Sequence, residues 1–476
     1  MRYIAPLVIA LCAPFVVNAA DMSEPARAWY ESGKASLEER KAQFRGSKKR
    51  ARNAILFIGD GMSVPTVTAA RIYEGQLRGE DGEGNLLSFE AFPASALSKT
   101  YAVDKQVTDS GSTATAMVTG VKTRFRQISM DETAGEGCDE GKLRTLVELA
   151  EEAGLATGVV STTRVTHATP ATLYSHVIER NYEMEGKQGC QDIASQLIDF
   201  PYGDGLEVAL GGGAPMFSAE ARDDGRDLAA EWQARFDNAV VIRDAGQLAA
   251  LDKEAQHVLG LFSESHMDYE LHRDTTANGQ PSLTEMTEAA INLVNNNRKG
   301  FFLMIEGGRI DHGHHAGNAK LALTETIEFS NAIRRAREMT EPDTLIVVTA
   351  DHGHTMSMSG YPDRGNPVLG IAGEDSEGRP YTTLGYANGP GYVEPDSLDA
   401  LRPDLSKIDT TADDYQQEAT VPAAMETHGG DDVPVYAVGP GSQWVNGVDG
   451  TARHLPHHQR GVVGALVQVA TGTSRG

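Results

Sequence analysis

The stretch Ala54-Ile-Leu-Phe-Ile58-Gly-Asp-Gly61 decides the fold class of this chain. It is a short apolar run closed by glycine and an acid, which is typical of a strand buried on both faces of a parallel sheet. Comparable apolar runs recur at 157–160, 301–305, 344–348 and 433–438. Helical patterns over 142–153, 283–297 and 319–339 separate several of them. The alternation predicts an α/β fold of three layers, with helices on both faces of a largely parallel central sheet.

Acidic residues follow three of these predicted strands. Asp60 comes two residues after Ile58, Glu306 directly after the run 301–305, and Asp351-His352 shortly after the run 344–348. The carboxyl ends of parallel strands share one edge of the sheet, so we expect these side chains to converge there. Converging carboxylates repel one another unless a cation compensates them. The pattern therefore predicts a metal centre at that edge.

A second informative stretch is Val107-Thr-Asp-Ser-Gly-Ser-Thr-Ala-Thr-Ala-Met117. It places Asp109 and Ser110 at the start of a predicted helix of small residues, where backbone N–H groups and the helix dipole favour an anion. A serine in that position is suited to attack a phosphate. Taken alone, the stretch is more typical of an ordinary helix cap, because Ser and Thr are common at helix starts.

The densest group of possible metal ligands is Glu306-Gly-Gly-Arg-Ile-Asp-His-Gly-His-His315. On a helix, Asp311 and His315 are four residues apart and face the same side, so they can share one metal. The run 351–354 and His428 supply a further carboxylate and more imidazoles. Mixed carboxylate and imidazole ligands favour zinc, whereas oxygen ligands such as Asp60, Glu306 and Thr169 favour magnesium.

Composition bounds the compartment and the partners of this chain of 476 residues. Residues 1–20 have the basic start, short apolar core and small-residue end of a signal peptide, which leaves a mature domain of 21–476. A lipoprotein signal centred on Cys12 is the weaker alternative. The formal net charge of −25 argues against nucleic acid as a partner, and no later run is long enough to span a membrane.

Cys138 and Cys190 remain after removal of the signal. An even pair in an oxidising compartment suggests a disulfide, and two free buried thiols are the alternative. The segment 360–426 is rich in Gly, Pro, Asp and Tyr and has no long periodic run, so we expect an inserted subdomain there. The triplet Gly211-Gly-Gly213 lacks a nucleotide-binding context and is interpreted as a turn.

Taken together, the motifs 107–115, 306–315, 351–352 and 426–430 resemble those of the alkaline phosphatases, in the family's order and across nearly the whole mature chain. The resemblance implies a homodimeric metalloenzyme that hydrolyses phosphate monoesters at alkaline pH with two zinc ions and one magnesium ion per subunit. It also implies a periplasmic or secreted protein.

The resemblance assigns a role to individual positions of this chain. Ser110 matches the nucleophile that becomes phosphorylated, and Arg180 matches the arginine that binds the phosphate oxygens. The metal ligands implied by the family are, for the first zinc, Asp311, His315 and His428; for the second zinc, Asp60, Asp351 and His352; and for magnesium, Asp60, Thr169 and Glu306. Without the family match, Arg180 is an ordinary surface arginine.

Other positions resemble the animal branch of the family and some marine bacterial enzymes. By this resemblance, Asp109, His167 and His312 lie beside the metal ligands. Enteric bacterial enzymes carry other residues at the two histidine positions. The Cys138–Cys190 pair matches the animal disulfide, and 360–426 matches the crown that covers the active-site entrance. No calcium site is expected, because Ser263 and Asn278 replace two acidic ligands of the animal enzymes.

Three alternatives remain open at this stage. Two are relatives on the same fold, a phosphodiesterase or a sulfatase, and the third is a periplasmic protein that binds metal or phosphate without turnover. The arginine and a third metal favour a monoester, because a monoester presents one more charged oxygen than a diester. A binding protein has no need of a serine at the start of that helix.

Overall fold

The computed structural model describes residues 50–394, 402–445 and 447–450. The predicted signal peptide, 1–20, lies outside the described residues. Within the described ranges no helix combines the length and the apolar character needed to cross a bilayer.

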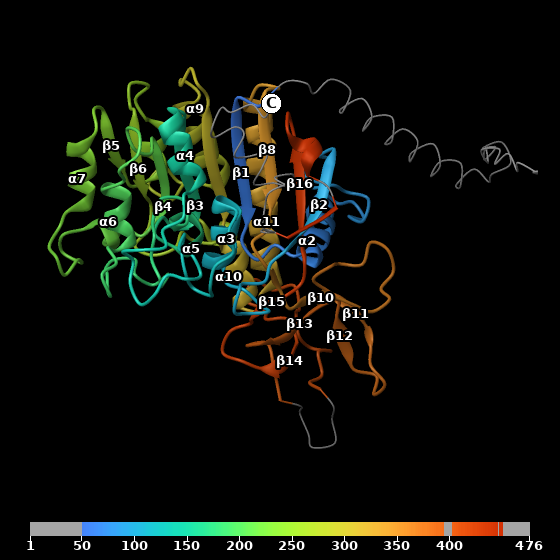
Figure 1. Cartoon of the computed structure of the whole chain (residues 1–476). Helices are drawn as coiled ribbons and strands as arrows, with labels where there is room; N and C mark the ends of the chain where they lie inside the picture. The colour runs from blue at the N-terminus through green and yellow to red at the C-terminus, as the bar shows by residue number, and fades with distance from the viewer. Residues whose placement is uncertain (1–49, 395–401, 446, 451–476) are drawn as a thin grey trace, which may run out of the picture. The chain divides into compact units, whose positions relative to one another are not determined.

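Ten strands form one sheet at the centre of the described fold (Figure 1). Their order across the sheet is β17-β2-β16-β8-β1-β7-β3-β4-β6-β5. The strands are β1 (Asn53–Gly59), β2 (Ala94–Lys99), β3 (Ala156–Arg164), β4 (Val208–Gly212), β5 (Ala239–Ile242), β6 (His257–Leu261), β7 (Phe301–Gly307), β8 (Thr344–Thr349), β16 (Val433–Val438) and β17 (Gly447–Gly450). The strands from β8 to β5 all run parallel, whereas β16 is antiparallel to both β8 and β2. The prediction of a largely parallel sheet is confirmed.

Helices cover both faces of this sheet. They are α2 (Val64–Leu77), α3 (Ser110–Thr119), α4 (Leu146–Ala153), α5 (Ala168–Ala171), α6 (Ile193–Ile198), α7 (Leu228–Arg235), α8 (Ala245–Ala249), α9 (Leu283–Val294), α10 (Arg309–His315) and α11 (Ala319–Met339). Alternate residues of β1 belong to different hydrophobic cores: Leu56 packs with residues of α3, α4 and α6, and Phe57 packs with residues of α2, α9 and α11. Since neighbouring strand residues point to opposite faces, a strand that is apolar throughout requires both layers.

Two details differ from the sequence-based expectation. The helix expected over 142–153 begins only at Leu146, because Thr145 and Glu148 form a capping box that fixes the first turn there. Gly211 and Gly212 are part of β4 rather than a turn. A Cβ atom at Gly212 would lie 2.0 Å from the carbonyl oxygen of Ser265, so glycine is required there by the close approach of another segment.

The segment expected to be an insert, 360–426, contributes to two small sheets. Its strands β13 (Leu384–Gly389) and β14 (Ala419–Pro422) form one with β10 (Met356–Met358), which precedes the segment, and β11 (Ile371–Glu374) pairs with β12 (Pro380–Thr382) in the other. Next to them, β9 (Gly353–His354) pairs with β15 (His428–Gly429), which sets His428 opposite His354. This short pairing returns the chain from the insert to the edge of the main sheet.

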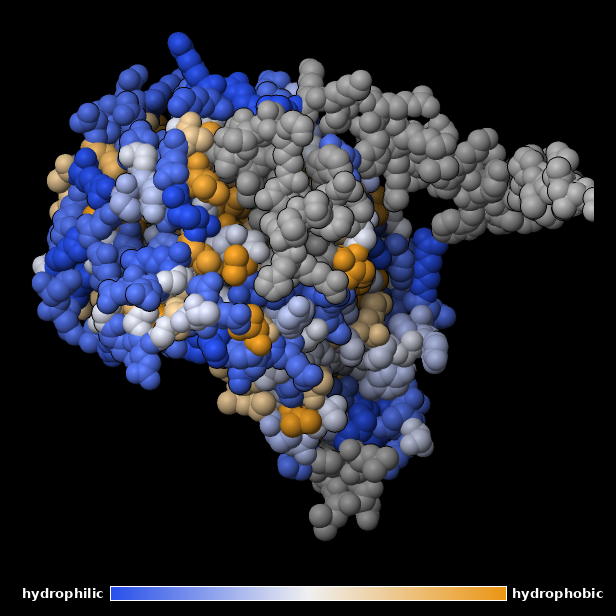
Figure 2. Space-filling model, viewed as in Figure 1, coloured by the Kyte–Doolittle hydropathy of each residue, from blue (hydrophilic) through white to orange (hydrophobic). Residues whose placement is uncertain are grey.

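The structure also shows a disulfide bond and, in the view of Figure 2, a mainly hydrophilic surface. A disulfide joins Cys138 and Cys190, with a separation of 52 residues. The face of the molecule seen in Figure 2 is mainly hydrophilic, with hydrophobic residues scattered singly or in small groups over its coloured part. Such a surface fits the strongly acidic composition.

Candidate active site

The predicted site residues follow adjacent strands at the middle of the sheet. In the order β8-β1-β7-β3, the register sets Ile58 beside both Thr349 and Glu306. Asp351 follows β8, Asp60 follows β1, and Glu306 stands near the end of β7. All three carboxylates are fully buried. The convergence expected from the sequence is therefore present in the fold.

This concentration of buried carboxylates raises the pKa of Asp60 well above its ordinary value, through burial first and then through the charges of Asp351, Asp311 and Glu306. Several of the oxygens have no hydrogen-bond partner among the described residues. They are Asp60 Oδ1 and Oδ2, Glu306 Oε1, Asp351 Oδ2 and Thr169 Oγ1. Buried oxygens without donors are costly unless a ligand satisfies them, so their chemistry fits divalent cations.

The first group of possible zinc ligands is Asp311, His315 and His428. His315 Nε2 lies 3.3 Å from Asp311 Oδ1, His428 Nε2 lies 3.4 Å from the same oxygen, and the two nitrogens are 3.1 Å apart. Ligand atoms that bind zinc tetrahedrally at about 2.0 Å lie about 3.3 Å from one another, so these spacings match.

The outer nitrogens of these two histidines support the same interpretation. His428 Nδ1 lies 2.8 Å from the carbonyl oxygen of Thr108, and His315 Nδ1 lies 2.5 Å from that of Glu426. A carbonyl oxygen only accepts, so each Nδ1 must carry the proton. The Nε2 lone pairs are therefore free to bind a metal, which is the usual arrangement around zinc histidines.

The second group is Asp60, Asp351 and His352. His352 Nε2 lies 3.4 Å from Asp60 Oδ1 and 3.4 Å from Asp351 Oδ2. The backbone N–H groups of Gly61 and His352 donate to the other oxygen of Asp351, at 3.0 and 2.9 Å, which leaves its Oδ2 to face the group. These residues fit a second zinc.

The third group is composed of oxygens. Glu306 Oε2 accepts hydrogen bonds from Ser161 and Thr163, and its Oε1, like Thr169 Oγ1, has no partner among the described residues. Glu306 and Asp60 each have an oxygen within 4.8 Å of the other. Burial raises the pKa of Glu306 to about 7. An oxygen-only set of this kind suits magnesium.

Ser110 is the first residue of α3. The Asp109 side chain caps this helix by accepting from the N–H groups of Gly111 and Ser112 at 3.2 and 3.3 Å. Ser110 Oγ lies 3.3 Å from His352 Nε2, at the edge of the second ligand group. The cap of this helix is therefore Asp109, and Ser110 follows it directly with its hydroxyl beside the second ligand group.

Arg180 lies in a turn beside this helix start. Its Nη1 donates to Asp109 Oδ2 at 2.9 Å, and its Nη2 donates to His167 Nε2 at 3.1 Å. Although burial opposes ionisation, Arg180 and several hydrogen bonds keep the pKa of Asp109 below its ordinary value. Asp109 therefore stays charged and holds the guanidinium beside Ser110.

Sequence reasoning did not assign His354 and Glu426 a role, yet both are fully buried within the site. His354 Nε2 lies 2.8 Å from Asp311 Oδ1, and its Nδ1 lies 2.5 Å from Glu426 Oε2. Burial lowers the pKa of His354, but the two carboxylates outweigh it and raise the pKa to about 9. The histidine-rich run 351–354 was the available signal for one of them. Glu426 opens the motif 426–430, but its contact with His354 depends on the β9–β15 pairing and could not be assigned from the sequence.

His167 and His312 lie together with a third histidine, His266, that the sequence did not single out. The ring centroids of His266 and His312 are 4.2 Å apart, and those of His266 and His167 are 5.0 Å apart. Burial, aided by neighbouring cationic groups, lowers the pKa of His266 to about 2, so this imidazole is neutral.

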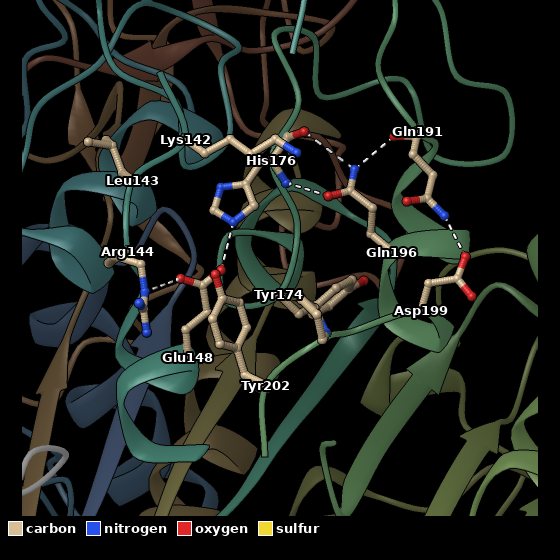
Figure 3. A pocket seen from close by; sticks show the side chains of 11 residues that line it. Lys142, Leu143, Arg144, Glu148, Tyr174, His176, Gln191, Gln196, Asp199 and Tyr202 are labelled. Atoms are coloured by element: carbon tan, nitrogen blue, oxygen red, sulfur yellow. Dashed lines mark hydrogen bonds and ion pairs between the residues drawn. The ribbon is translucent and has the colours of Figure 1, made fainter. Parts of the chain in front are cut away.

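A separate cavity of about 270 Å³ lies between α4 and α6 (Figure 3). Glu148 contacts two other side chains of the cavity lining. His176 Nε2 lies 2.8 Å from Glu148 Oε1, and Arg144 Nε donates to Glu148 Oε2 at 3.0 Å. None of the predicted site residues lines this cavity. The reaction chemistry is gathered at the strand ends instead.

Comparison with known proteins identifies the family. Residues 51–458 match the alkaline phosphatase family. The chain belongs to the alkaline phosphatase family. It is 40% identical over 485 residues to alkaline phosphatase 4 of Drosophila melanogaster, covering 91% of this chain and 81% of that protein. It is also 40% identical over 463 residues to the tissue-nonspecific isozyme of Gallus gallus, covering 90% and 88%.

Solved structures agree with this membership of the alkaline phosphatase family. The Thermus thermophilus alkaline phosphatase matches with a TM-score of 0.66 and 27% identity, covering 90% of this chain and 93% of that one. The enzyme of the Antarctic bacterium TAB5 matches in fold with a TM-score of 0.65 and 23% identity, covering 90% and 100%. As a member of this metal-dependent family, the protein hydrolyses phosphate monoesters.

Proposed function

We propose that hydrolysis proceeds through a phosphoserine at Ser110, with Arg180 binding the phosphate oxygens. The observation that carries this proposal is the joint position of the two residues around Asp109, which caps the helix of Ser110 and holds Arg180 at 2.9 Å. A planar guanidinium can offer two parallel N–H groups to a phosphate, and the helix start adds a favourable dipole.

In the proposed reaction, Ser110 Oγ attacks phosphorus and the ester oxygen departs as an alcohol. Water then cleaves the phosphoserine and releases inorganic phosphate. Arg180 offsets the charge that develops on the phosphate oxygens, and Asp109 keeps that arginine in place throughout.

We propose that two zinc ions and one magnesium ion serve this site. Asp311, His315 and His428 would hold the first zinc. Asp60, Asp351 and His352 would hold the second, and Asp60, Glu306 and Thr169 would hold magnesium. When bound, such ions lower the pKa of the serine hydroxyl and stabilise the leaving oxygen. The support is the ligand spacing, the directions of the histidine hydrogen bonds and the unpartnered carboxylate oxygens described above.

The substitution Ser110→Ala tests the serine. We expect it to lower kcat for a chromogenic phosphate monoester by roughly 10³-fold or more, because the covalent route is removed. Acid quenching during turnover of labelled substrate should trap labelled phosphoserine in the unmodified enzyme and none in Ser110→Ala.

Thr119→Ala, at the other end of α3, is the matched control and should keep both the rate and the label. If Ser110→Ala retained the rate or the label, the serine would not be the nucleophile. If metal-replete unmodified protein bound phosphate without turning over any ester, the alternative of a binding protein would replace the proposal.

We further propose, from family resemblance, that the protein is a homodimer that acts in the periplasm or outside the cell after loss of residues 1–20. The disulfide between Cys138 and Cys190 supports an oxidising compartment. In the same way, 360–426 is proposed to act as a crown over the active-site entrance. Light scattering of the purified protein reports the subunit number.

A further inference from the structure

The segment 126–129 contacts both the helix of the proposed nucleophile and the turn that carries the proposed phosphate-binding arginine. Ile128 and Val177 pair in antiparallel fashion, with N–H to oxygen hydrogen bonds of 2.9 and 3.1 Å. At the end of the segment, Ser129 donates its backbone N–H to Thr115 Oγ1 of α3 at 2.8 Å. The segment therefore joins two parts of the active site that lie far apart in the sequence.

The backbone of this segment is unusual at both of its ends. Arg126 has a φ of 73° and Ser129 a φ of 47°, so both residues lie in the left-handed region although neither is glycine. For a residue with a Cβ atom this region costs free energy, and such conformations persist where the surroundings hold them. The contacts of Arg126 show what holds it.

The backbone of Arg126 contacts two residues of the proposed phosphate-binding group. Its N–H donates to Asp109 Oδ1 at 2.9 Å, and its carbonyl oxygen accepts from the N–H of Arg180 at 2.9 Å. Because Asp109 Oδ1 is bound in this way, Oδ2 is the oxygen that accepts from Arg180 Nη1. One residue thus touches both the chain that carries the guanidinium and the carboxylate that holds it.

The side chain of Arg126 binds Glu179, the residue directly before Arg180. Arg126 Nε donates to both oxygens of Glu179, at 3.0 and 2.8 Å, and Nη2 donates to Oε1 at 2.6 Å. The two side chains are 37% and 29% exposed, so this ion pair lies at the surface of the site.

Glu179 is an ionised carboxylate beside two arginines. Although burial opposes ionisation, hydrogen bonds from Arg126 and the N–H of Asn181, followed by the charges of Arg126 and Arg180, lower the pKa of Glu179. Its charge therefore acts on Arg180 as well as on Arg126. A carboxylate free of Arg126 would compete with Asp109 and with phosphate for the same guanidinium.

We propose that Arg126 is a positioning residue for Arg180, because its guanidinium occupies the Glu179 carboxylate and so leaves Arg180 available to phosphate. The left-handed backbone of Arg126, bound to Asp109 and Arg180, fixes the place from which its side chain acts. The proposal rests on the phosphate-binding role proposed for Arg180. Arg126 itself acts through that residue, since its own guanidinium is already bound to Glu179.

The substitution Arg126→Asn removes the guanidinium and keeps a residue that tolerates the left-handed region. In the metal-replete enzyme, at fixed pH and ionic strength, we expect the inhibition constant of inorganic phosphate to rise about five-fold. The KM for p-nitrophenyl phosphate should rise by about the same factor, because a bare carboxylate beside Arg180 opposes an anion. We expect kcat to fall by less than about two-fold.

A second substitution tests the cause of this loss. Arg126→Asn combined with Glu179→Gln removes the carboxylate that the first change sets free. We expect the inhibition constant of phosphate in the double variant to return to within about two-fold of that of the unmodified enzyme. A merely structural ion pair would not give this recovery, since the double variant lacks both of its charges.

The pair of Arg226 and Glu231 near the start of α7 offers a matched control. Its side chains are 31% and 39% exposed, and Arg226 binds both carboxylate oxygens of Glu231. Surface ion pairs of this kind contribute little to stability. Arg226→Asn should therefore leave the phosphate inhibition constant and the KM unchanged.

Arg180→Gln separates this proposal from the one on which it rests. It should raise the phosphate inhibition constant by itself, and a failure to do so would contradict the role of Arg180 rather than that of Arg126. In the Arg180→Gln background, adding Arg126→Asn should change the constant by less than about two-fold. A further five-fold rise there would mean that Arg126 binds phosphate directly, and would overturn its positioning role.

Two other results would also overturn the positioning role. One is an unchanged phosphate inhibition constant in folded Arg126→Asn, and the other is the absence of recovery in the double variant with Glu179→Gln. Arg126→Lys keeps the charge without the planar fork, so its constant should lie between those of the unmodified enzyme and Arg126→Asn. Should Arg126→Asn not fold, an unchanged constant in Arg126→Lys would contradict the proposal.

Discussion

At the scale of single residues, the partner of the outer ring nitrogen separates the histidines of this site into two kinds. His315 and His428 donate to backbone carbonyl oxygens, so their inner nitrogens can bind a cation. His266 and His312 accept from arginines and present N–H groups instead. Sequence alone marks His315 and His428 as possible ligands and does not single out His266, and residue type carries no information on the tautomer of any of them.

Two acids away from the metal ligands, the buried Glu151 and the half-buried Glu207, bear on stability at alkaline pH. Glu151 of α4 is 2% exposed, and burial together with the charge of Glu207 raises its pKa to about 9 from an ordinary 4.5. Burial likewise raises the pKa of Glu207 to about 8. The folded protein therefore holds protons that the unfolded chain has already released, and stability falls as the pH rises from about 4.5 to about 9.

Glu151→Gln should remove much of this loss, since glutamine keeps the oxygen that accepts from Thr157 and carries no charge. We expect the free energy of unfolding at pH 10 to exceed that of the unmodified enzyme by about 1–3 kcal/mol, and the difference to disappear near pH 5. Urea unfolding at both pH values measures it, with the exposed Glu254→Gln as the control. A difference independent of pH would refute the assignment.

At the scale of elements, the site follows from the adjacency of β8, β1, β7 and β3 in the sheet. The sequence could predict the strands and the acids that follow them, because apolar runs and strand-end residues are local signals. It did not predict the direction of β16, because an apolar run does not distinguish a parallel strand from an antiparallel one. It also missed β9 and β15, because two-residue strands have no pattern of their own and bring His354 and Glu426 together only through tertiary pairing.

The disulfide is an element-scale constraint on the same site. His167, Thr169 and Arg180 all lie within the 52-residue segment that Cys138 and Cys190 close. Closing such a loop reduces the freedom of the unfolded chain, so we expect Cys138→Ser to lower the free energy of unfolding by roughly 2–4 kcal/mol. Urea unfolding measures this, and reduction of the unmodified enzyme is the matched control. Equal stability in all three samples would contradict the expectation.

At the scale of the whole molecule, an enzyme with a net charge of −25 acts on an anionic substrate. The negative charge of its surface disfavours the approach of that substrate, so the electrostatic potential at the strand ends must be positive. Cations held by the buried carboxylates, together with Arg180, would make the local potential positive. Family membership and the ligand geometry agree on this point, although they are independent observations.

The most direct measurement compares hydrolysis of a chromogenic phosphate monoester with the matching diester and sulfate ester at about pH 9–10. Each assay is run before chelation, after chelation, and after zinc and magnesium are restored. The account predicts strong monoester hydrolysis that the chelator abolishes and the two metals together restore, with little turnover of the other esters. Absence of turnover in metal-replete protein, indifference to the chelator, or a preference for the diester or the sulfate would contradict it.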